Sequence, residues 1–134
     1  ETLAMADPNL TAIVLPQLHR LGLQIALDNF GAGPISLCAL RTFAPDLIKT
    51  DRTLVLQMQA ERVSRDVLAL IAALAQKLPC EILAQGVETV GQLQHLRTLG
   101  CHFAQGYLLS PPLAPEATTE FLQRHTCAAD TPVR

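Results

Sequence analysis

IALDNFGAG, residues 25–33, joins an apolar run to an acid, an amide and a glycine-rich turn. A short apolar run bounded by turn residues predicts a β-strand, here over residues 23–27. The strand is then expected to end on Asp28 and Asn29. Two adjacent polar side chains at a strand end are either turn residues or members of a functional site, and the other strands of the chain help to decide between these possibilities.

The hydrophobic pattern of the whole chain alternates between strands and helices. A helix over 8–21 comes first, stopped by Gly22, and four strand–helix units follow. Strands are predicted at 23–27, 47–49, 81–84 and 102–104, and the helices that follow them at 36–43, 60–78, 89–99 and 115–124. Such alternation predicts an α/β fold with a parallel sheet and helices packed outside it.

The composition excludes several classes of protein. The 134 residues suffice for one domain, and the net charge of -2 gives no basic surface for duplex nucleic acid. The longest apolar run, residues 67–75, is far shorter than the roughly 20 residues of a membrane helix, so no membrane insertion is expected. The cysteines lack zinc-site spacing and indicate a reduced, cytoplasmic protein; they are Cys38, Cys80, Cys101 and Cys127.

Polar residues follow every predicted strand. These groups are Asp28-Asn29, Lys49-Thr50-Asp51, Gln85-Gly86 with Glu88 just beyond, and Gln105-Gly106-Tyr107. The carboxyl ends of parallel strands meet at one edge, where such folds place their ligand sites. A single polar residue after a strand is usually a turn or cap residue, but capping does not call for Lys49 or Glu88. Carboxylates suit Mg²⁺ or Mn²⁺ and a lysine suits phosphate, so we expect a site for both.

Four motifs resemble the second half of the EAL domain family, whose members hydrolyse the second messenger cyclic di-GMP. They are DNFGAG at 28–33, DLIKTD at 46–51, LAQGVET at 83–89 with Gln92, and LGCHFAQGYLLSPPL at 99–113. The resemblance implies a TIM-like (β/α)8 barrel, of which this chain supplies the C-terminal half with four parallel strands. It also implies two divalent metals, Mg²⁺ or Mn²⁺, a metal-activated water and the product pGpG. The partial EAL domain is expected over residues 1–124, with a frayed tail over 125–134.

The resemblance also assigns roles to single positions. Metal positions are Asp28, Asn29 and Glu1; catalytic positions are Lys49, Gln85 and Glu88; ligand-binding positions are Asp51 and Gln105. Asn29 stands where active members have a second metal-binding aspartate, and Gln85 stands where they have a catalytic glutamate. Thr50 replaces the isoleucine of the lysine motif. An amide is a poor ligand for a dication and cannot act as a general base.

These amides predict a degenerate EAL domain that has lost hydrolysis and acts in cyclic di-GMP signalling through ligand binding or protein contacts. Three alternatives remain open. The complete protein could be an active metal-dependent phosphodiesterase, with the missing ligands on a partner. The domain could be a purely structural interaction module. Random drift or deliberate inactivation could also give Asn29 and Gln85 without a new role.

A half barrel leaves two strand edges unpaired and one sheet face open. We expect that face to include Ile25, Leu27, Ile48 and Ile82. Its exposure predicts self-association or pairing with a complementary N-terminal half.

Overall fold

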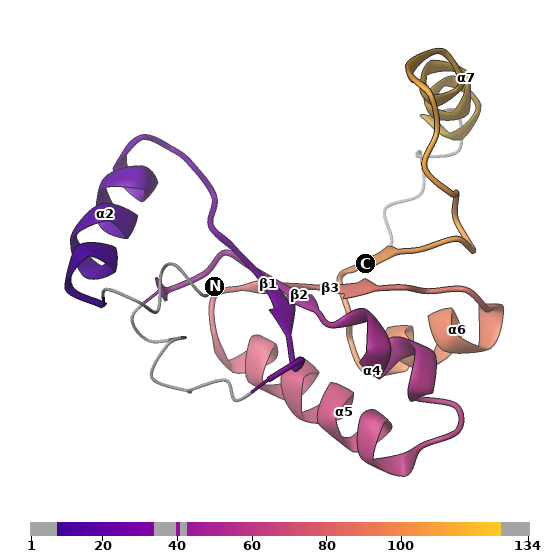
Figure 1. The fold of residues 1–134 in the computed structure, drawn as a ribbon, viewed down its shortest axis with the longest axis horizontal. Helices are drawn as coiled ribbons and strands as arrows, with labels where there is room; N and C mark the ends of the chain where they lie inside the picture. The colour runs from indigo at the N-terminus through magenta and orange to yellow at the C-terminus, as the bar shows by residue number, and fades with distance from the viewer. Residues whose placement is uncertain (1–7, 34–39, 41–42, 127–134) are drawn as a thin grey trace.

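The structure is a computed structural model that describes residues 8–33, 40 and 43–126. Figure 1 shows its elements in chain order. They are α2 (Pro8–Arg20), β1 (Ala26–Phe30), β2 (Leu47–Thr50), α4 (Arg52–Gln57), α5 (Arg62–Lys77), β3 (Glu81–Gln85), α6 (Val90–Thr98), β4 (Phe103–Gln105) and α7 (Pro115–Thr126). No helix among these residues is long and apolar enough to cross a membrane.

The four strands form one sheet in the order β1-β2-β3-β4, and every neighbouring pair is parallel. The α/β prediction with a parallel sheet is therefore confirmed. Leu47 pairs with Glu81 and Leu83 pairs with Phe103, which places the carboxyl ends of all four strands along the same edge. That edge is where the predicted site residues lie.

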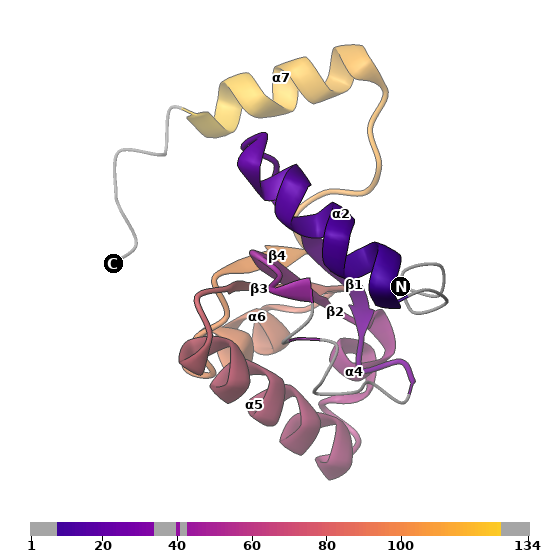
Figure 2. The same cartoon turned by 90° about the vertical axis from the view of Figure 1, so that its left-hand side faces the viewer.

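Helices cover one side of the sheet. In both Figure 1 and Figure 2, α4, α5 and α6 lie together beneath it, whereas α2 and α7 stand away from it on the other side. The core lies between the sheet and the three covering helices, where Ile48, Ile82 and Leu96 have almost no exposed surface. Most of the apolar stabilisation of the described residues therefore comes from this layer.

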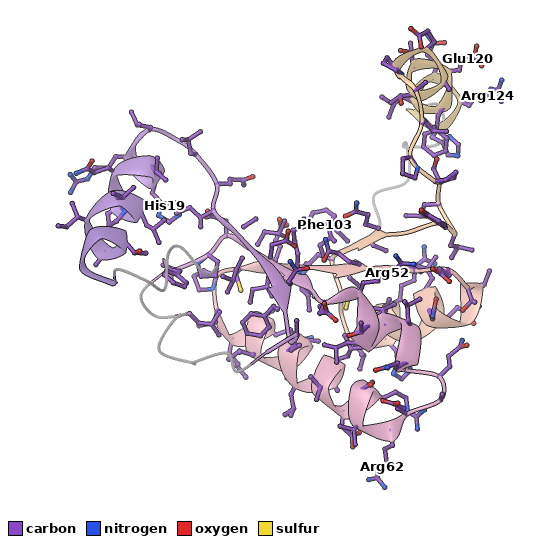
Figure 3. The ribbon with its side chains drawn as sticks, viewed as in Figure 1. His19, Arg52, Arg62, Phe103, Glu120 and Arg124 are labelled. Atoms are coloured by element: carbon purple, nitrogen blue, oxygen red, sulfur yellow. The ribbon has the colours of Figure 1, made fainter. Side chains whose placement is uncertain are left out.

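The face of the sheet that is left open differs from the one predicted. Four residues were expected on the open face: Ile25, Leu27, Ile48 and Ile82. The last three are buried against the helices, and Ile25 lies just before β1 and is half-buried. Side chains alternate along a strand, so a shift of one residue exchanges the two faces. The open face instead carries Leu83 and Phe103, and Figure 3 shows Phe103 on the side away from α5. The aliphatic side chains of Leu27, Ile48 and Ile82 face the helices because the layer between the sheet and the helices excludes water.

The ends of several elements follow local sequence signals. Thr89 caps α6 with a complete capping box, and Gly100 ends that helix with a φ of 80°. The predicted helix over 8–21 is observed as α2, and Gly22 follows it with a φ of 77°. These signals act over a few residues, so the sequence carries them directly.

Other bounds needed correction. The first strand is β1 at Ala26–Phe30 and not 23–27, because half-exposed Leu23 lies in an irregular segment before the strand and buried Phe30 extends it. The short helix α4 was missed before α5. The predicted helix over 36–43 lies outside the described residues except for Leu40 and Phe43. Helix α7 continues through residue 126, and the rest of the predicted tail, 127–134, lies outside the described residues.

Two of the cysteines are described, and both carry free thiols. Burial raises the pKa of Cys80, and it raises the pKa of Cys101 to about 11. Such thiols pack as small apolar groups and are unreactive near neutral pH.

Candidate functional site

A β-bulge presents the first two site residues. The pairing of β1 with β2 shifts register between Leu27 and Phe30, so Asp28 and Asn29 project from within the strand and not from a turn after it. Asn29 has a φ of 55°, a left-handed conformation that asparagine tolerates better than most residues. Its N–H donates to Asp28 Oδ1 at 3.0 Å. Bulges commonly re-aim side chains beside functional sites.

Lys49 lies between the predicted metal position and the predicted catalytic position. Its Nζ is 3.2 Å from Asp28 Oδ1, and its side chain is only 25% exposed. With the Gln85 amide oriented to satisfy both neighbours, Gln85 Oε1 accepts from Lys49 Nζ at 3.2 Å and Nε2 donates to the Thr50 carbonyl at 2.8 Å. The structure therefore brings Asp28, Lys49 and Gln85 together across three neighbouring strands.

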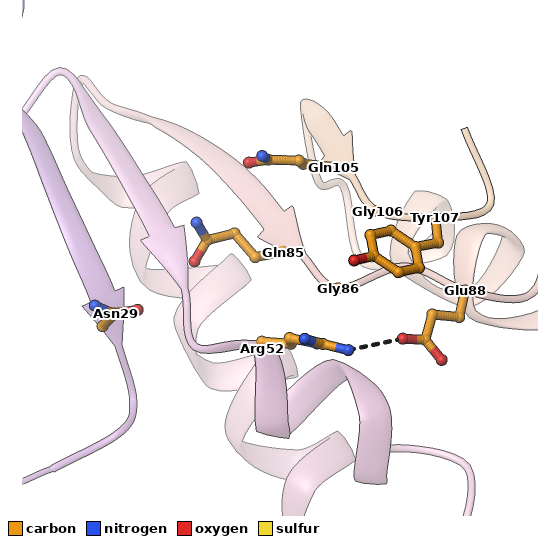
Figure 4. Close-up of a pocket in the computed structure, with 8 residues that line it drawn as sticks. All are labelled: Asn29, Arg52, Gln85, Gly86, Glu88, Gln105, Gly106 and Tyr107. Carbon is orange, nitrogen blue, oxygen red and sulfur yellow. Dashed lines mark hydrogen bonds and ion pairs between the residues drawn. The ribbon is translucent and has the colours of Figure 1, made fainter. Parts of the chain in front are cut away.

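A pocket of 310 Å³ opens at this edge of the sheet (Figure 4). Its lining comes from the ends of β1, β3 and β4, the turns after them and the start of α4: Asn29, Arg52, Gln85, Gly86, Glu88, Gln105, Gly106 and Tyr107. Four residues of the predicted site, Asn29, Gln85, Glu88 and Gln105, thus share one cavity. Its size is within the range of small-molecule sites.

Arg52 is the member that sequence reasoning missed. Its guanidinium is 3.0 Å from Glu88 Oε1, as the dashed line in Figure 4 marks. The stem of Arg52 lies over Gly86, where a Cβ would be 2.4 Å from Arg52 Cγ. The signal was its position directly after the lysine motif, at the first residue of α4. Arg52 and Glu88 tie α4 to the turn that follows β3.

Asp51 has a structural task. It is the N-cap of α4, and its Oδ1 accepts from Thr53 N at 2.9 Å and from the Thr53 hydroxyl. It does not appear among the residues that line the pocket. Its predicted ligand-binding role stays a prediction. Glu1, the third predicted metal position, lies outside the described residues.

The Gln105-Gly106-Tyr107 motif is joined to the turn after β3 by main-chain hydrogen bonds. The Gln105 carbonyl accepts from Gly86 N at 2.8 Å and from Val87 N at 3.0 Å, and Leu108 N donates to the Val87 carbonyl at 3.0 Å. Gly106 is obligatory here because a Cβ would be 2.1 Å from the Val87 oxygen. The fit of these two turns sets the place of Gln105.

Gln92 supports the same turn from below. It is 4% exposed, and its Oε1 accepts from Glu88 N at 2.8 Å and Thr89 N at 2.9 Å. Its Nε2 donates to the Val55 carbonyl at 3.1 Å, which connects the turn to α4. A buried amide with all of these partners fixes the backbone of the site.

The charges of the site balance. Asp28 pairs with Lys49, and Glu88 pairs with Arg52, while Asn29 and Gln85 are neutral. Within residues 8–33, 40 and 43–126, no three His, Cys, Asp or Glu side chains lie close enough together to hold a metal ion. By themselves these residues therefore do not fit a pair of divalent ions, which needs several anionic oxygens.

A separate polar contact stabilises the opposite edge of the sheet. Asp46 Oδ2 accepts from Ile25 N at 2.7 Å and lies 3.0 Å from His19 Nε2 on α2. The Ile25 hydrogen bond is the main reason that the pKa of Asp46 is lowered. This contact ties α2 to the strands β1 and β2 and belongs to the scaffold.

Comparison with known proteins gives one consistent result. Residues 1–112 match the EAL domain family. Over 134 residues the chain is 37% identical to the cyclic di-GMP phosphodiesterase NbdA of Pseudomonas aeruginosa, of which it covers 17%. The structure matches that of the phosphodiesterase PaMucR in its c-di-GMP complex with a TM-score of 0.80 and 34% identity, over 86% of this chain and 47% of that one.

A second solved structure is similar. The manganese and cyclic di-GMP complex of Klebsiella pneumoniae BlrP1 has a TM-score of 0.77 and 32% identity, over 84% of this chain and 29% of that one. The chain thus spans less than half the length of each of these relatives. It belongs to the EAL domain family, and its four parallel strands are consistent with half of that family's TIM-like barrel.

Proposed function

We propose that this chain is the C-terminal half of a degenerate EAL domain that binds cyclic di-GMP and does not hydrolyse it. The family and the named activities of NbdA and PaMucR support the ligand. The two neutral amides at Asn29 and Gln85 support the loss of hydrolysis.

The contacts of Gln85 carry the proposal. When the Gln85 amide is assigned so that each of its ends meets a complementary partner, Nε2 donates to the Thr50 carbonyl at 2.8 Å. A glutamate in this rotamer would face that carbonyl with an unprotonated oxygen, and two acceptors at such a distance repel each other. The local backbone is therefore suited to an amide. An amide cannot take a proton from an attacking water near neutral pH, so this position supplies no general base.

Asn29 weakens metal binding in addition. A neutral amide replaces the carboxylate that the family resemblance places here, and Gln85 removes a second negative charge. Fewer anionic oxygens bind Mg²⁺ or Mn²⁺ less tightly and lower the pKa of a bound water less. When bound, the two metals of an active relative would supply the activated water. The described residues of this chain would instead orient the ligand and donate hydrogen bonds to it.

The pocket retains groups that suit a nucleotide. Amide donors from Asn29 and Gln105 and the guanidinium of Arg52 line it, and a phosphodiester is an anion that such donors bind without a metal. The exposed ring of Tyr107 offers an apolar surface for a base. Because the chain spans only half of the barrel, its affinity on its own is expected to be low.

The open sheet face supports a partner. Leu83 is half-buried there, Phe103 is 47% exposed, and β1 and β4 are the edge strands of the described sheet. The proposed cover is a complementary N-terminal half or a second copy of the chain. Light scattering separates these possibilities: a dimer at micromolar concentration supports self-association, and a monomer contradicts it.

A complete barrel tests the loss of hydrolysis. The chain can be joined to the N-terminal half of the EAL domain of PaMucR, and pGpG release can be measured with Mn²⁺. We expect the chimera to bind cyclic di-GMP without releasing pGpG, and the double change Asn29→Asp with Gln85→Glu to restore release. A matched control is the double change Gln57→Glu with Gln94→Glu, which adds the same two charges at exposed positions on α4 and α6.

The outcomes separate the alternatives. Release of pGpG by the unmodified chimera would favour a working phosphodiesterase. Binding without release in both the unmodified and the doubly changed chimera would place the lesion at another residue.

A further inference from the structure

We infer that Thr50 and Gln85 act together to hold the ammonium group of Lys49 against Asp28, so that this ammonium takes the place of a divalent cation there. The inference concerns the cation of the site. It deepens the proposed function, because it names the cation that meets Asp28 at the predicted metal position, but its test uses no nucleotide.

The ammonium is held from two sides. Lys49 lies on β2, and its Nζ is 3.2 Å from Asp28 Oδ1 on β1. With the Gln85 amide assigned as above, Nζ is also 3.2 Å from Gln85 Oε1 on β3. The side chain is three-quarters buried, so it is confined to this position. An ammonium between a carboxylate and an amide oxygen is arranged like a small cation between two oxygen ligands.

Thr50 fixes the orientation of Gln85. The Thr50 carbonyl accepts from Gln85 Nε2 at 2.8 Å, which turns Oε1 toward Lys49. The Thr50 hydroxyl accepts from Gln85 N at 3.3 Å, and Thr50 has no exposed surface. An isoleucine, which the family resemblance places at this position, has no hydroxyl for that N–H. Thr50 and Gln85 both depart from the family pattern and touch each other, so we treat them as a coupled pair of positioning residues.

One carboxylate oxygen of Asp28 is engaged by these contacts, and the side chain is 52% exposed. Its Oδ1 accepts from Asn29 N at 3.0 Å as well as meeting Lys49 Nζ at 3.2 Å. A dication at this oxygen would have to displace the ammonium or lie beside it against charge repulsion. The described part of the chain offers no cluster of further acids to compensate.

Manganese affinity tests the inference directly. Free Mn²⁺ can be measured by electron paramagnetic resonance during titration of the chain, with no nucleotide present. We expect Lys49→Met to bind Mn²⁺ about tenfold more tightly than the unmodified chain, the factor that corresponds to a water-screened repulsion between nearby charges. The control Lys77→Met removes the same charge at an exposed position on α5, and its Mn²⁺ affinity should equal that of the unmodified chain.

The coupled pair has its own variants. Thr50→Val keeps the shape and removes the hydroxyl, and Gln85→Met removes the amide, so each should raise Mn²⁺ affinity part of the way. Thr50→Ser restores the hydroxyl and should return the affinity to that of the unmodified chain. Because Thr50 acts by positioning Gln85 Oε1, and Gln85→Met has no such oxygen, the double variant should gain less than the product of the two single gains.

Two results would overturn the inference. One is an equal Mn²⁺ affinity in Lys49→Met and Lys77→Met, when thermal melting shows that both variants are folded. Should Lys49→Met fail to fold, Lys49→Gln provides the same comparison. The other is a gain in Mn²⁺ affinity in the double variant that equals the product of the gains of Thr50→Val and Gln85→Met. Loss of cyclic di-GMP binding would contradict the proposed function but would not alter these metal titrations.

Discussion

Replacing Gly106 with alanine should separate the two turns that build the site. The new Cβ would be 2.1 Å from the Val87 oxygen, 2.3 Å from its nitrogen and 2.7 Å from its carbonyl carbon. These are main-chain atoms and cannot move aside as a side chain can. Ordinary contact requires the turns to part by about 1 Å or more, since heavy atoms pack no closer than roughly 3.5 Å.

The cost follows from the hydrogen bonds across this contact. Three main-chain bonds join the turns, from Gly86 N and Val87 N to the Gln105 carbonyl and from Leu108 N to the Val87 carbonyl. Their lengths of 2.8 to 3.0 Å would grow beyond the range of a hydrogen bond. At about 1 kcal/mol for each bond, the free energy of unfolding should fall by about 3 kcal/mol. The melting temperature should fall by roughly 10 °C.

Urea denaturation and thermal melting measure this effect. Gly33→Ala is a matched control, because a Cβ at Gly33 meets no atom within 4 Å and the change removes the same backbone freedom. The control should lie within about 0.5 kcal/mol of the unmodified chain. A Gly106→Ala variant as stable as Gly33→Ala would refute the reasoning, because β3 and β4 could not then meet in the described register.

Three further predictions concern single side chains. Gln92→Leu should lower the free energy of unfolding in urea by about 3 kcal/mol, since two part-buried N–H groups and one buried carbonyl lose their partner. An unchanged free energy of unfolding would show that Gln92 does not stabilise this turn. The thiol of Cys101 should react with Ellman's reagent about a hundredfold more slowly than an ordinary thiol at pH 8. Because its folded pKa of about 11 exceeds the ordinary value of 9.0, stability should also fall as pH rises through that window, and reaction at the ordinary rate would contradict this burial. The lowered pKa of Asp46 contributes stability that is present above 3.8 and is lost as pH falls below that value; Asp46→Asn should lose this acid dependence, and an unchanged acid midpoint would contradict it.

Local signals made much of the fold predictable. The capping box at Thr89 and the glycine stop at Gly100 act over four residues or fewer. The strands β2 and β3 were each predicted to within one residue, because their apolar runs are short and sharply bounded. The site residues Asn29, Gln85, Glu88 and Gln105 were found because polar groups follow every strand, and the structure gathers these four in one pocket.

Features that depend on contacts between distant residues were not predictable. Gln85 meets Thr50 across 35 positions of sequence, and Arg52 meets Glu88 across 36. The bulge at Asp28 and Asn29 is a property of the pairing of β1 with β2, so the sequence alone placed the strand too early. The covered face of the sheet depends on where α5 packs, and hydrophobicity alone favoured the wrong side.

Calorimetric titration of the chain with cyclic di-GMP, first with Mn²⁺ and then with EDTA, tests the central claim most directly. The claim is that amide and cationic side chains hold the dinucleotide without a divalent metal. We predict the same weak dissociation constant in both buffers and no pGpG in the cell afterwards. Heat that appears only with Mn²⁺, pGpG in the product, or no heat in either buffer would contradict it.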